Sequence, residues 1–590
     1  MEKSIEELQR AMEAGQATSR QLVDAYLARI EAYDQQGPSL NAITVLNPRA
    51  RETADALDAE RKAKGARGPL HGIPVLVKDN YETIEMPTSA GSIALAGFHP
   101  ARDAFQVRRL KDAGAVIIGK TNMHELAAGI TTVGSRFGQT RNPYDLDRNP
   151  GGSSGGTGAA VAANFAVAGM GSDTCGSIRN PASHNNLVGL RGTQGLSSRT
   201  GIVPLSSTQD IGGPIARSIV DLALMLDATV GSDQADPSTA ISAGHIPPSY
   251  RAGLRIDEIK GARLGVIRSL FGTAGEDQEV TGIVQRSLDA LKKTGAEISD
   301  VVVPGLDDLL RDSSMINTDF KFDLAEYLAA AGNPPVKSLG EILDKGLYHA
   351  ALEANFRTRN AIEQRDNEQS RRARIKRTAL RGAVDAVLNE HKLVALVYPT
   401  LRRKPARIGE AQGGTTCQLS SHSGLPALSV PAGFSDDGLA VGMDLLGGAF
   451  SEQQLLSLGY SIEQTLNLRR PPFSTPALVD GRAPKARVAT AALQGTAVNL
   501  RYDSTTAVLQ YDIKLGAADR GRLESLWIHA GTPEKPGAGR HQIYAARQPL
   551  TGQLRLSSRD RTDLNEGRLL VRFFVRDKSG SAGDVPLRFK

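Results

Sequence analysis

The spacing of apolar residues changes along the chain. Up to about residue 480, segments whose apolar residues recur at i, i+3 and i+4, such as residues 23–34 (VDAYLARIEAYD), alternate with short β-branched runs, such as residues 73–79 (IPVLVKD) and 115–120 (AVIIGK). The first pattern predicts amphipathic helices, and the second predicts buried strands. Because the two patterns alternate, the sequence predicts an α/β architecture with a largely buried sheet.

After residues 469–489, a stretch rich in proline and basic residues, the apolar period becomes two. Five segments with this period are predicted to be strands: residues 506–515, 523–531, 552–558, 567–577 and 585–589. Together they predict a small all-β, sandwich-like domain. The sequence therefore predicts a first domain over residues 1–480, a linker over residues 481–489 and an all-β domain over residues 490–590.

The composition is that of a soluble globular protein, with 40% hydrophobic and 23% charged residues among 590. The longest apolar runs, such as residues 161–170, fall short of the roughly 20 residues that a membrane-spanning helix needs, so we predict no membrane span. The N-terminus is amphipathic and has no apolar signal core. A native start at Met1 predicts a cytoplasmic protein, whereas a secreted or periplasmic protein would have the same sequence after removal of a signal peptide.

Positive charge is concentrated in the predicted all-β domain. Residues 491–590 hold 16 Lys and Arg against 10 Asp and Glu, so they carry the whole net charge of +6. The domain is therefore predicted either to bind a surface or polymer, with anionic surfaces slightly favoured, or to dock on the first domain and stabilise it. The run RRARIKR (residues 371–377) follows acidic residues in a helical pattern, which indicates a solvated helix face rather than a nucleic-acid site. The sequence does not indicate an oligomeric state.

The chain has two cysteines, Cys175 and Cys417. They are too few for a disulfide framework and have no metal-ligand spacing, which favours a reducing compartment. No motif indicates a metal or cofactor, so we expect none.

Two glycine-rich turns contain the candidate chemistry: PGGSSGGTGAAVAA (residues 150–163) and GSDTCGSIRNPA (residues 171–182). In the second turn, Ser177 follows Gly176, and the backbone N–H groups of such a turn can converge on the oxyanion of a tetrahedral intermediate. Ser177 can therefore be a nucleophile, but a serine hydroxyl needs a base at neutral pH. The run GGSSGG alone could be a linker or a phosphate loop, but it lacks the Gly-Lys-Ser/Thr ending of a Walker motif.

Lys78, in the run HGIPVLVKDN, is the best candidate for the base. No histidine lies in either turn, and His71 and His184 stand beside the motifs without a fixed partner. A lysine accepts a proton only when it is neutral, which requires its pKa to fall by about 3 units from about 10.4, or roughly 4 kcal/mol. Burial in the preceding apolar run can supply part of this shift. Ser153 then fits between Lys78 and Ser177 as a proton relay, and its flanking glycines permit a cis peptide, which costs about 3–4 kcal/mol.

These residues resemble the Ser-cisSer-Lys triad of the amidase signature family. The spacings of 75 residues from Lys78 to Ser153 and of 24 residues from Ser153 to Ser177 fit that family. The resemblance continues through residues 120–129, 189–218 and 424–456 and covers roughly Ser4 to Pro472. It implies a central mixed, mostly parallel β-sheet flanked by helices, with Lys78 as the base, Ser153 as the cis relay and Ser177 as the acylated nucleophile. The all-β domain lies outside the resemblance.

The other residues of the turns take supporting roles in this resemblance. It implies an oxyanion hole at Thr174, Cys175 and Gly176, supported by Ser154, Asp173 and Arg179. Many family members have glycine in place of Cys175, so we interpret Cys175 as a small filler whose backbone N–H alone matters, with a thiol lining the oxyanion turn as the alternative. Arg179 is expected to fix the turn through hydrogen bonds rather than to contact the substrate.

The resemblance also implies where a substrate binds. It places the acyl half near the Ser177 turn and residues 123–129, with residues 310–360 and 417–422 as walls. Few charged residues accompany the motifs, so we predict hydrolysis of the C–N bond of neutral, hydrophobic or aryl amides through an acyl-enzyme, as in an aryl acylamidase. A urethanase, which cleaves carbamates, or an esterase would use the same steps.

Two further classes of protein are weighed against this prediction. A glutaminase-like subunit of a tRNA-dependent amidotransferase shares the family fold, although a fused β domain is not expected in it. A catalytically dead binding protein is disfavoured by the intact Lys78, Ser153 and Ser177. The predicted partner is a small-molecule amide or carbamate, with no nucleic acid.

Overall fold

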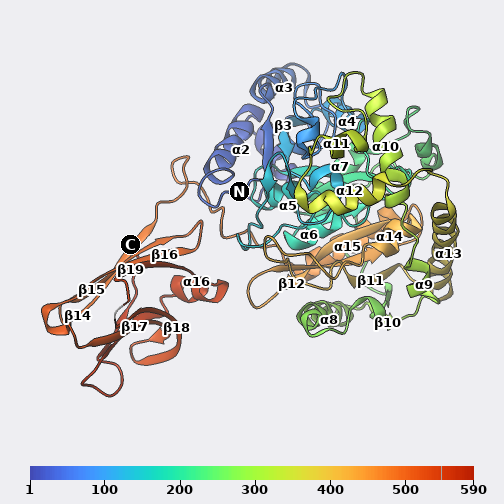
Figure 1. The fold of residues 1–590 in the computed structure, drawn as a ribbon. Helices are drawn as coiled ribbons and strands as arrows, with labels where there is room; N and C mark the ends of the chain where they lie inside the picture. The colour runs from blue at the N-terminus through green and yellow to red at the C-terminus, as the bar shows by residue number, and fades with distance from the viewer. Residues whose placement is uncertain (547) are drawn as a thin grey trace. The chain divides into compact units, whose positions relative to one another are not determined.

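The computed structural model describes residues 1–546 and 548–590, which form two compact units (Figure 1). The first unit comprises Met1–Ser435 and Leu439–Pro472, and the second comprises Asp436–Gly438 and Phe473–Lys590. Each unit has its own buried apolar core. Within the described residues, no helix is long and apolar enough to cross a membrane.

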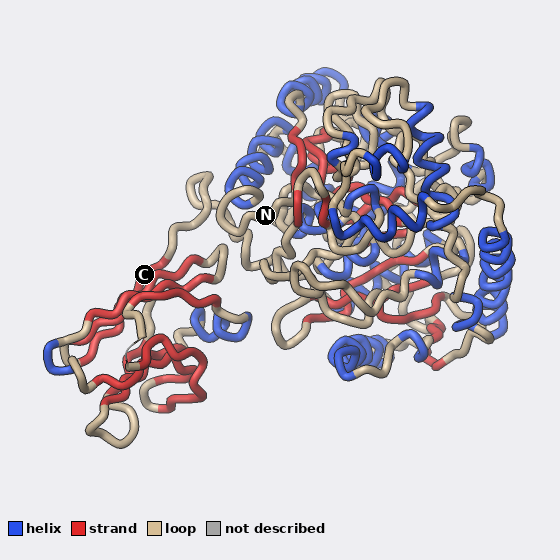
Figure 2. Tube along the Cα trace, in the orientation of Figure 1, coloured by secondary structure: helices blue, strands red, loops and turns tan. Residues whose placement is uncertain are grey.

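A mixed sheet of 11 described strands runs through the first unit and is surrounded by helices (Figure 2). In spatial order the strands are β1 (Ile43–Leu46), β3 (Val116–Thr121), β2 (Pro74–Lys78), β6 (Ala168–Asp173), β8 (Ile211–Ala216), β7 (Val188–Arg191), β12 (Ala427–Phe434), β13 (Ala440–Leu446), β11 (Ala395–Pro399), β9 (Arg263–Val266) and β10 (Glu297–Asp300). Strands β3, β2 and β6 form one parallel block and β11, β9 and β10 form another, with antiparallel pairing between the blocks. The predicted α/β fold with a mixed central sheet is confirmed.

The first unit also contains the helices of the predicted α/β architecture. They are α1 (Ile5–Glu13), α2 (Ser19–Tyr33), α3 (Ala50–Lys64), α4 (Phe105–Asp112), α5 (Gly155–Ala162), α6 (Arg179–His184), α7 (Ile219–Thr229), α8 (Gln278–Lys293), α9 (Leu306–Leu310), α10 (Ile316–Ala330), α11 (Leu339–Asp344), α12 (Glu353–Asn360), α13 (Glu368–Glu390), α14 (Gln418–Ser423) and α15 (Glu452–Leu466). Helix α2 confirms the periodicity of residues 23–34, and it begins after Thr18, whose hydroxyl accepts a hydrogen bond from the N–H of Gln21 at 3.2 Å. A short hairpin of β4 (Val133–Gly134) and β5 (Gly138–Gln139) lies outside the large sheet.

The basic run at residues 371–377 lies on α13, as predicted. Three of its arginines form exposed ion pairs with acidic residues at the start of the helix: Arg371 and Arg374 pair with Asp366, and Arg372 pairs with Glu368. The prediction of a solvated helix face is confirmed.

The parallel block of β3, β2 and β6 places the candidate catalytic residues at one edge of the sheet. Strand β2 ends at Lys78, and β6, its hydrogen-bonded parallel neighbour, ends at Asp173. Both strands are completely buried, which their runs of apolar and small residues allow. Because the carboxyl ends of adjacent parallel strands meet at one edge, Lys78 and the turn after Asp173 lie close together.

The second unit contains two four-stranded antiparallel sheets. One has the order β14 (Arg487–Leu493), β15 (Thr496–Asp503), β16 (Val508–Lys514) and β19 (Thr551–Arg555); the other has the order β18 (Lys535–Ala545), β17 (Leu523–Thr532), β20 (Leu569–Val575) and β21 (Gly583–Pro586). A single helix, α16 (Ser558–Asn565), accompanies these sheets in the described part of this unit. The predicted small all-β fold is confirmed.

Three strands of this unit, β14, β15 and β18, lie outside the five segments predicted as strands. Strand β14 begins inside the segment predicted as a linker, so residues 487–489 belong to a strand. Strand β14 contains three alanines, and the first half of β18 is exposed and contains Pro536, Gly537 and Gly539. Such residues are depleted in strands, so propensity alone does not find these two elements, whereas the alternating burial of β15 was an available signal.

Candidate active site

Lys78 lies at the end of β2 and is completely buried. Its Nζ atom is 2.7 Å from Ser153 Oγ, 2.8 Å from Ser172 Oγ and 3.3 Å from the carbonyl oxygen of Ser172. The sequence predicts the contact with Ser153 but not the contact with Ser172. Since alternate residues of a strand face opposite sides, a polar residue at position 172 in an otherwise apolar or glycine-rich strand was the available signal.

Burial lowers the pKa of Lys78 to about 7. The negative charges of Asp173 and Asp210 act in the opposite direction, but the loss of hydration dominates. A large fraction of Lys78 is therefore neutral near pH 7 and can accept a proton. This shift is close to the one that the sequence argument requires of a lysine base.

Ser153 lies two residues before the start of α5 and contacts Lys78. The Gly152–Ser153 peptide bond is cis, and Ser153 is completely buried. Its carbonyl oxygen accepts a hydrogen bond from the N–H of His124 at 3.0 Å. The backbone of Ser153 is thus held by His124, and its hydroxyl is held by Lys78.

Ser177 is held next to this turn through its backbone. The N–H of Ser154 donates to the carbonyl oxygen of Ser177 at 3.2 Å, and the Ser154 hydroxyl contacts the carbonyl oxygen of Ser172 at 3.2 Å. Ser177 is 3% exposed, and its hydroxyl makes no hydrogen bond within the part of the chain that the structure describes. The structure therefore joins Lys78 to Ser153 and joins the Ser177 backbone to the next residue, Ser154, with the Ser177 hydroxyl left unengaged.

The turn from Thr174 to Ser177 is shaped by Asp173. Its carboxylate accepts hydrogen bonds from the N–H groups of Gly176 at 2.7 Å and Ile178 at 3.2 Å. Gly176 has φ of +83°, a conformation that favours glycine. Because the N–H of Gly176 is already engaged, the N–H groups of Thr174, Cys175 and Ser177, which have no acceptor among the described residues, are the free donors of the turn.

Two arginines hold Asp173 in place. Arg179 donates from Nε to its carboxylate at 3.3 Å and also contacts Asp444 at 2.5 Å, while Arg191 contacts the carboxylate at 3.1 Å. Burial alone would raise the pKa of Asp173, but Arg179 and Arg191 lower it to about 2. Asp173 is therefore a permanent anion, which suits a group that accepts backbone hydrogen bonds.

The two cysteines form a disulfide bond, Cys175–Cys417, which the sequence analysis did not predict. The interpretation of Cys175 as an unattached filler is wrong, and the argument for a reducing compartment loses its basis. The partners are 242 residues apart, and only the fold brings them together. The fact that they are the sole cysteines was the one signal in the sequence.

The histidines beside the motifs take no part in this cluster. The prediction that His71 has no fixed partner is wrong, because its Nε2 atom is 2.9 Å from the carbonyl oxygen of Leu57 and its Nδ1 atom accepts from the N–H of Arg67 at 3.3 Å. Burial lowers the pKa of His184 to about 3, so its ring is neutral. Within the described residues, no group of three or more His, Cys, Asp or Glu side chains is arranged to hold a metal ion.

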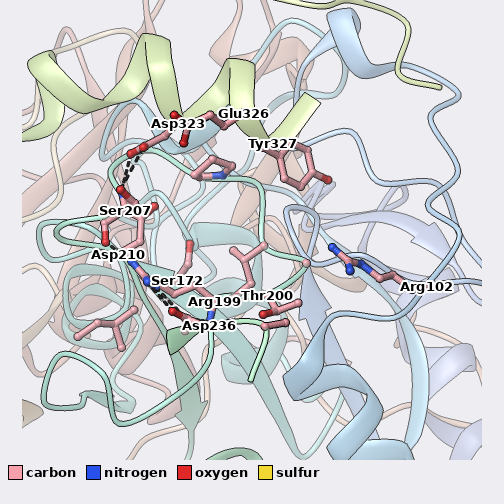
Figure 3. Close-up of a pocket in the computed structure, with 16 residues that line it drawn as sticks. Arg102, Ser172, Arg199, Thr200, Ser207, Asp210, Asp236, Asp323, Glu326 and Tyr327 are labelled. Carbon is pink, nitrogen blue, oxygen red and sulfur yellow. Dashed lines mark hydrogen bonds and ion pairs between the residues drawn. The ribbon is translucent and has the colours of Figure 1, made fainter. Parts of the chain in front are cut away.

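Two cavities lie near the cluster, and neither is lined by Lys78, Ser153 or Ser177. The first, here called the Ser172 cavity, has a volume of about 420 Å³ and is lined by polar residues that include Ser172, Asp210, Arg199 and Asp323 (Figure 3). Figure 3 shows Asp323, Glu326 and Tyr327 on the helix above this cavity and the Arg199–Asp236 pair below them. Since Ser172 contacts Lys78, the cavity reaches the lysine from its Ser172 side.

The second cavity, here called the Gly129 cavity, has a volume of about 560 Å³. Its lining includes Gly129, Thr131, Asn149, Leu352 and Asn355. It therefore joins part of the predicted acyl segment, residues 123–129, to α12 in the predicted wall, residues 310–360. Apolar residues of the same two segments pack in one buried cluster: Met123, Leu126, Ala127, Ala128, Phe320, Leu324, Leu352 and Phe356.

Comparison with known proteins defines the class. Residues 21–456 match the family described as Amidase. This match spans more than half of the chain, so the protein belongs to the amidase signature family and is an amide hydrolase that acts on C–N bonds.

The individual relatives have different names. The chain is 38% identical over 493 residues to a glutamyl-tRNA(Gln) amidotransferase subunit from Halorhodospira halophila, covering 78% of this chain and 97% of the relative. The native peptide amidase of Stenotrophomonas maltophilia has 38% identity and a TM-score of 0.74, with 80% of this chain and 98% of that chain covered. A bacterial aryl acylamidase of the amidase signature family has 25% identity and a TM-score of 0.68, with 78% and 96% covered.

Proposed function

We propose that this amide hydrolase works through Lys78, Ser153 and Ser177 as a Ser-cisSer-Lys triad. Neutral Lys78 accepts the proton of Ser153, and Ser153 accepts the proton of Ser177 as the Ser177 oxygen attacks the amide carbonyl. The protonated lysine then returns a proton through Ser153 to the leaving nitrogen, which departs as an amine. Water hydrolyses the acyl-enzyme by the same proton route in reverse.

One observation carries this proposal. Lys78 is completely buried, its pKa is lowered to about 7, and its Nζ atom lies 2.7 Å from Ser153 Oγ. A lysine with an ordinary pKa would be a cation at neutral pH and could not act as a base. A structural lysine would be expected to pair with a carboxylate, as Lys120 does with Asp79 at 3.3 Å. The partners of Lys78 are instead hydroxyl and carbonyl groups.

We propose that the oxyanion is bound by the Ser177 turn. Of the predicted residues Thr174, Cys175 and Gly176, the N–H of Gly176 is held by Asp173, and Thr174 Oγ1 donates to Asp210 at 2.5 Å. The free N–H groups of Thr174, Cys175 and Ser177 are therefore the donors in this proposal. Ser154, Asp173 and Arg179 act by fixing the turn rather than by contacting the substrate.

The substrate class that we propose is a neutral amide with an apolar or aryl part, bound in the Gly129 cavity. The buried apolar cluster behind this cavity favours an uncharged acyl group. The similarity to the peptide amidase and aryl acylamidase structures supports the same class of substrate. Carbamates and esters can enter the same acyl-enzyme pathway and form the second group of candidates.

A glutaminase-like component of an amidotransferase is the alternative that the sequence similarity favours. Glutamine is a zwitterion, so it needs groups of both charges at its α-carbon, and the lining of the Gly129 cavity contains one of each, Arg407 and Glu410. The proposal is tested by measuring kcat/KM of the purified chain for an anilide, a peptide amide, a carbamate, an ester and glutamine. We expect the neutral amides to be the best substrates. Ammonia release from glutamine alone, with no turnover of the neutral amides, would contradict the proposed substrate class.

A further inference from the structure

The Cys175–Cys417 disulfide lies within the Ser177 turn. Cys175 is partly exposed, whereas the other residues from 171 to 180 are buried, and Cys417 is 4% exposed. Cys175 also provides one of the free N–H groups of the turn. The cross-link thus joins a proposed oxyanion donor to the segment that precedes α14.

Cys175 has few other attachments. On one side of it Thr174 is anchored to Asp210 through its hydroxyl, and on the other side the N–H of Gly176 is anchored to Asp173. The remaining contact of the Cys175 side chain is a hydrogen bond from Ser421 Oγ to its sulfur at 3.2 Å, and Ser421 belongs to the same α14 segment as Cys417. The direction of the Cys175 N–H is therefore set by two attachments: the hydrogen bond from Gln209 Nε2 to the Thr174 carbonyl oxygen of the same peptide group, at 3.1 Å, and the link to this segment.

Cys417 is itself held against the turn. Its carbonyl oxygen accepts a hydrogen bond from Arg179 Nη2 at 3.3 Å, and Arg179 also binds Asp173. A Cβ atom placed on Gly176 would lie 2.9 Å from the Cβ of Cys417, so Cys417 packs directly on the glycine. The disulfide therefore closes a ring that runs from Cys175 through Cys417, Arg179 and Asp173 back to the turn.

We propose that the Cys175–Cys417 disulfide is a positioning element that aims the N–H of Cys175 at the oxyanion, so that a dithiol reductant slows amide hydrolysis reversibly. This inference rests on the proposed function of the triad. An oxyanion donor acts on the transition state and not on the bound substrate, so its displacement lowers kcat and leaves KM nearly unchanged. We expect a roughly tenfold to 10²-fold loss of kcat, because small misplacements and lost donors have effects of this size.

The redox step is an ordinary thiol–disulfide exchange. A thiolate of the dithiol attacks the Cys175 sulfur, which is the more exposed of the two, and Cys417 leaves as a thiolate that takes up a proton. The second thiol of the reductant then releases Cys175 and closes a cyclic disulfide. Two electrons pass from the dithiol to the protein, which gains two thiols.

The test uses the full-length protein and its preferred amide substrate. Free thiols, kcat, KM and melting temperature are measured before treatment, after reduction with dithiothreitol and after reoxidation with oxidised glutathione. We expect no free thiol before treatment and two after reduction, a fall in kcat with little change in KM, and recovery on reoxidation. Two free thiols in the untreated protein, or an unchanged kcat after complete reduction, would overturn the proposal.

Two variants separate positioning from loss of folding. Cys417→Ser removes the cross-link but keeps the Cys175 N–H, so it should show the kcat of the reduced wild type without any reductant. The Cys175→Ala/Cys417→Ala double variant should no longer respond to dithiothreitol. If Cys417→Ser fails to fold, reduced wild type at a temperature well below its melting point gives the same comparison. Equal responses of wild type and double variant to dithiothreitol would contradict the proposal.

Failure of this inference can be distinguished from failure of the proposed function. If Ser177→Ala keeps wild-type activity, the triad itself is wrong. If Ser177→Ala is inactive and the acyl-enzyme forms equally fast in oxidised and reduced wild type, the triad stands and the positioning role of the disulfide is wrong.

Discussion

The two units of the protein differ in how deeply they bury charged side chains. In the first unit Lys78, Asp173, Arg179 and Arg191 are completely buried around the Ser177 turn. In the second unit the Arg522–Asp577 pair leaves 48% and 56% of the two side chains exposed, and the more buried Arg540–Asp560 pair still leaves 19% of the arginine exposed. Removing a charge from water costs several kcal/mol, whereas an exposed pair contributes little. The buried charges around the Ser177 turn therefore indicate a functional site, whereas the exposed Arg522–Asp577 pair indicates an ordinary protein surface.

The largest predicted effect comes from the triad. We expect Ser177→Ala and Lys78→Ala each to lower kcat/KM by roughly 10⁴-fold to 10⁶-fold, because members of such a unit cannot substitute for one another. The readouts are steady-state hydrolysis and the mass of the acyl-enzyme in intact protein. Lys120→Met is the matched control, since Lys120 is also completely buried but pairs with Asp79 and Thr88. It should lower stability without removing acyl-enzyme formation. An equal loss of acylation in Lys120→Met would mean that the loss in Lys78→Ala follows from removing a buried lysine and not from removing a base.

The next effect concerns stability. Arg179→Met leaves Asp173 and Asp444 without one of their buried cationic partners. Loss of one member of a buried ion pair costs roughly 3–5 kcal/mol, so the denaturant midpoint of the first unit should fall by a corresponding amount. A midpoint equal to that of the wild type would show that Arg179 does not stabilise the turn.

A third prediction separates the two roles proposed for the second unit. A chain that ends at Pro472 keeps the triad, both cavities and the apolar cores of the first unit. We expect it to fold and to keep the kcat of the full chain, with any adsorption to surfaces or polymers lost. The measurements are thermal melting, hydrolysis and co-sedimentation with an anionic polymer. Collapse of the shortened chain would favour a domain that stabilises the catalytic unit by docking on it.

The smallest effect is expected at the surface of the second unit. Arg522→Ala removes an exposed ion pair with Asp577 and should leave both the melting temperature and the rate unchanged within error. A clear loss of stability would show that this surface charge contributes more than its exposure suggests.

Much of the fold follows from local pattern. The runs around Val75 and Ile117 are apolar over their whole length and become the buried strands β2 and β3, and the 3.6-residue period of residues 23–34 becomes part of α2. Strand β18 could not be found in this way, because its exposed, glycine-containing half has no alternation. Its pairing with β17 decides its structure, and pairing is not a local property.

The candidate site likewise contains residues that the local sequence identifies and contacts that only the fold creates. Lys78, Ser153 and Ser177 stand in conspicuous runs of sequence, so their types and spacing identify them. Ser172 and the Cys175–Cys417 bond depend on which strand lies beside Lys78 and on where the chain returns 242 residues later. Contacts of that kind are set by packing between distant segments, so the local signals, a polar residue in β6 and a lone pair of cysteines, do not identify the partners.

The central claim is that Lys78 works as a neutral base. The most direct measurement is the pH dependence of kcat/KM for a neutral amide, because this profile reports the pKa of the free enzyme's essential base. Since protonation of Lys78 removes the base and its pKa is about 7, activity should rise with pH through about 7 and level off above it. A rate that keeps rising to the pKa of an ordinary lysine, near 10.4, would contradict the account.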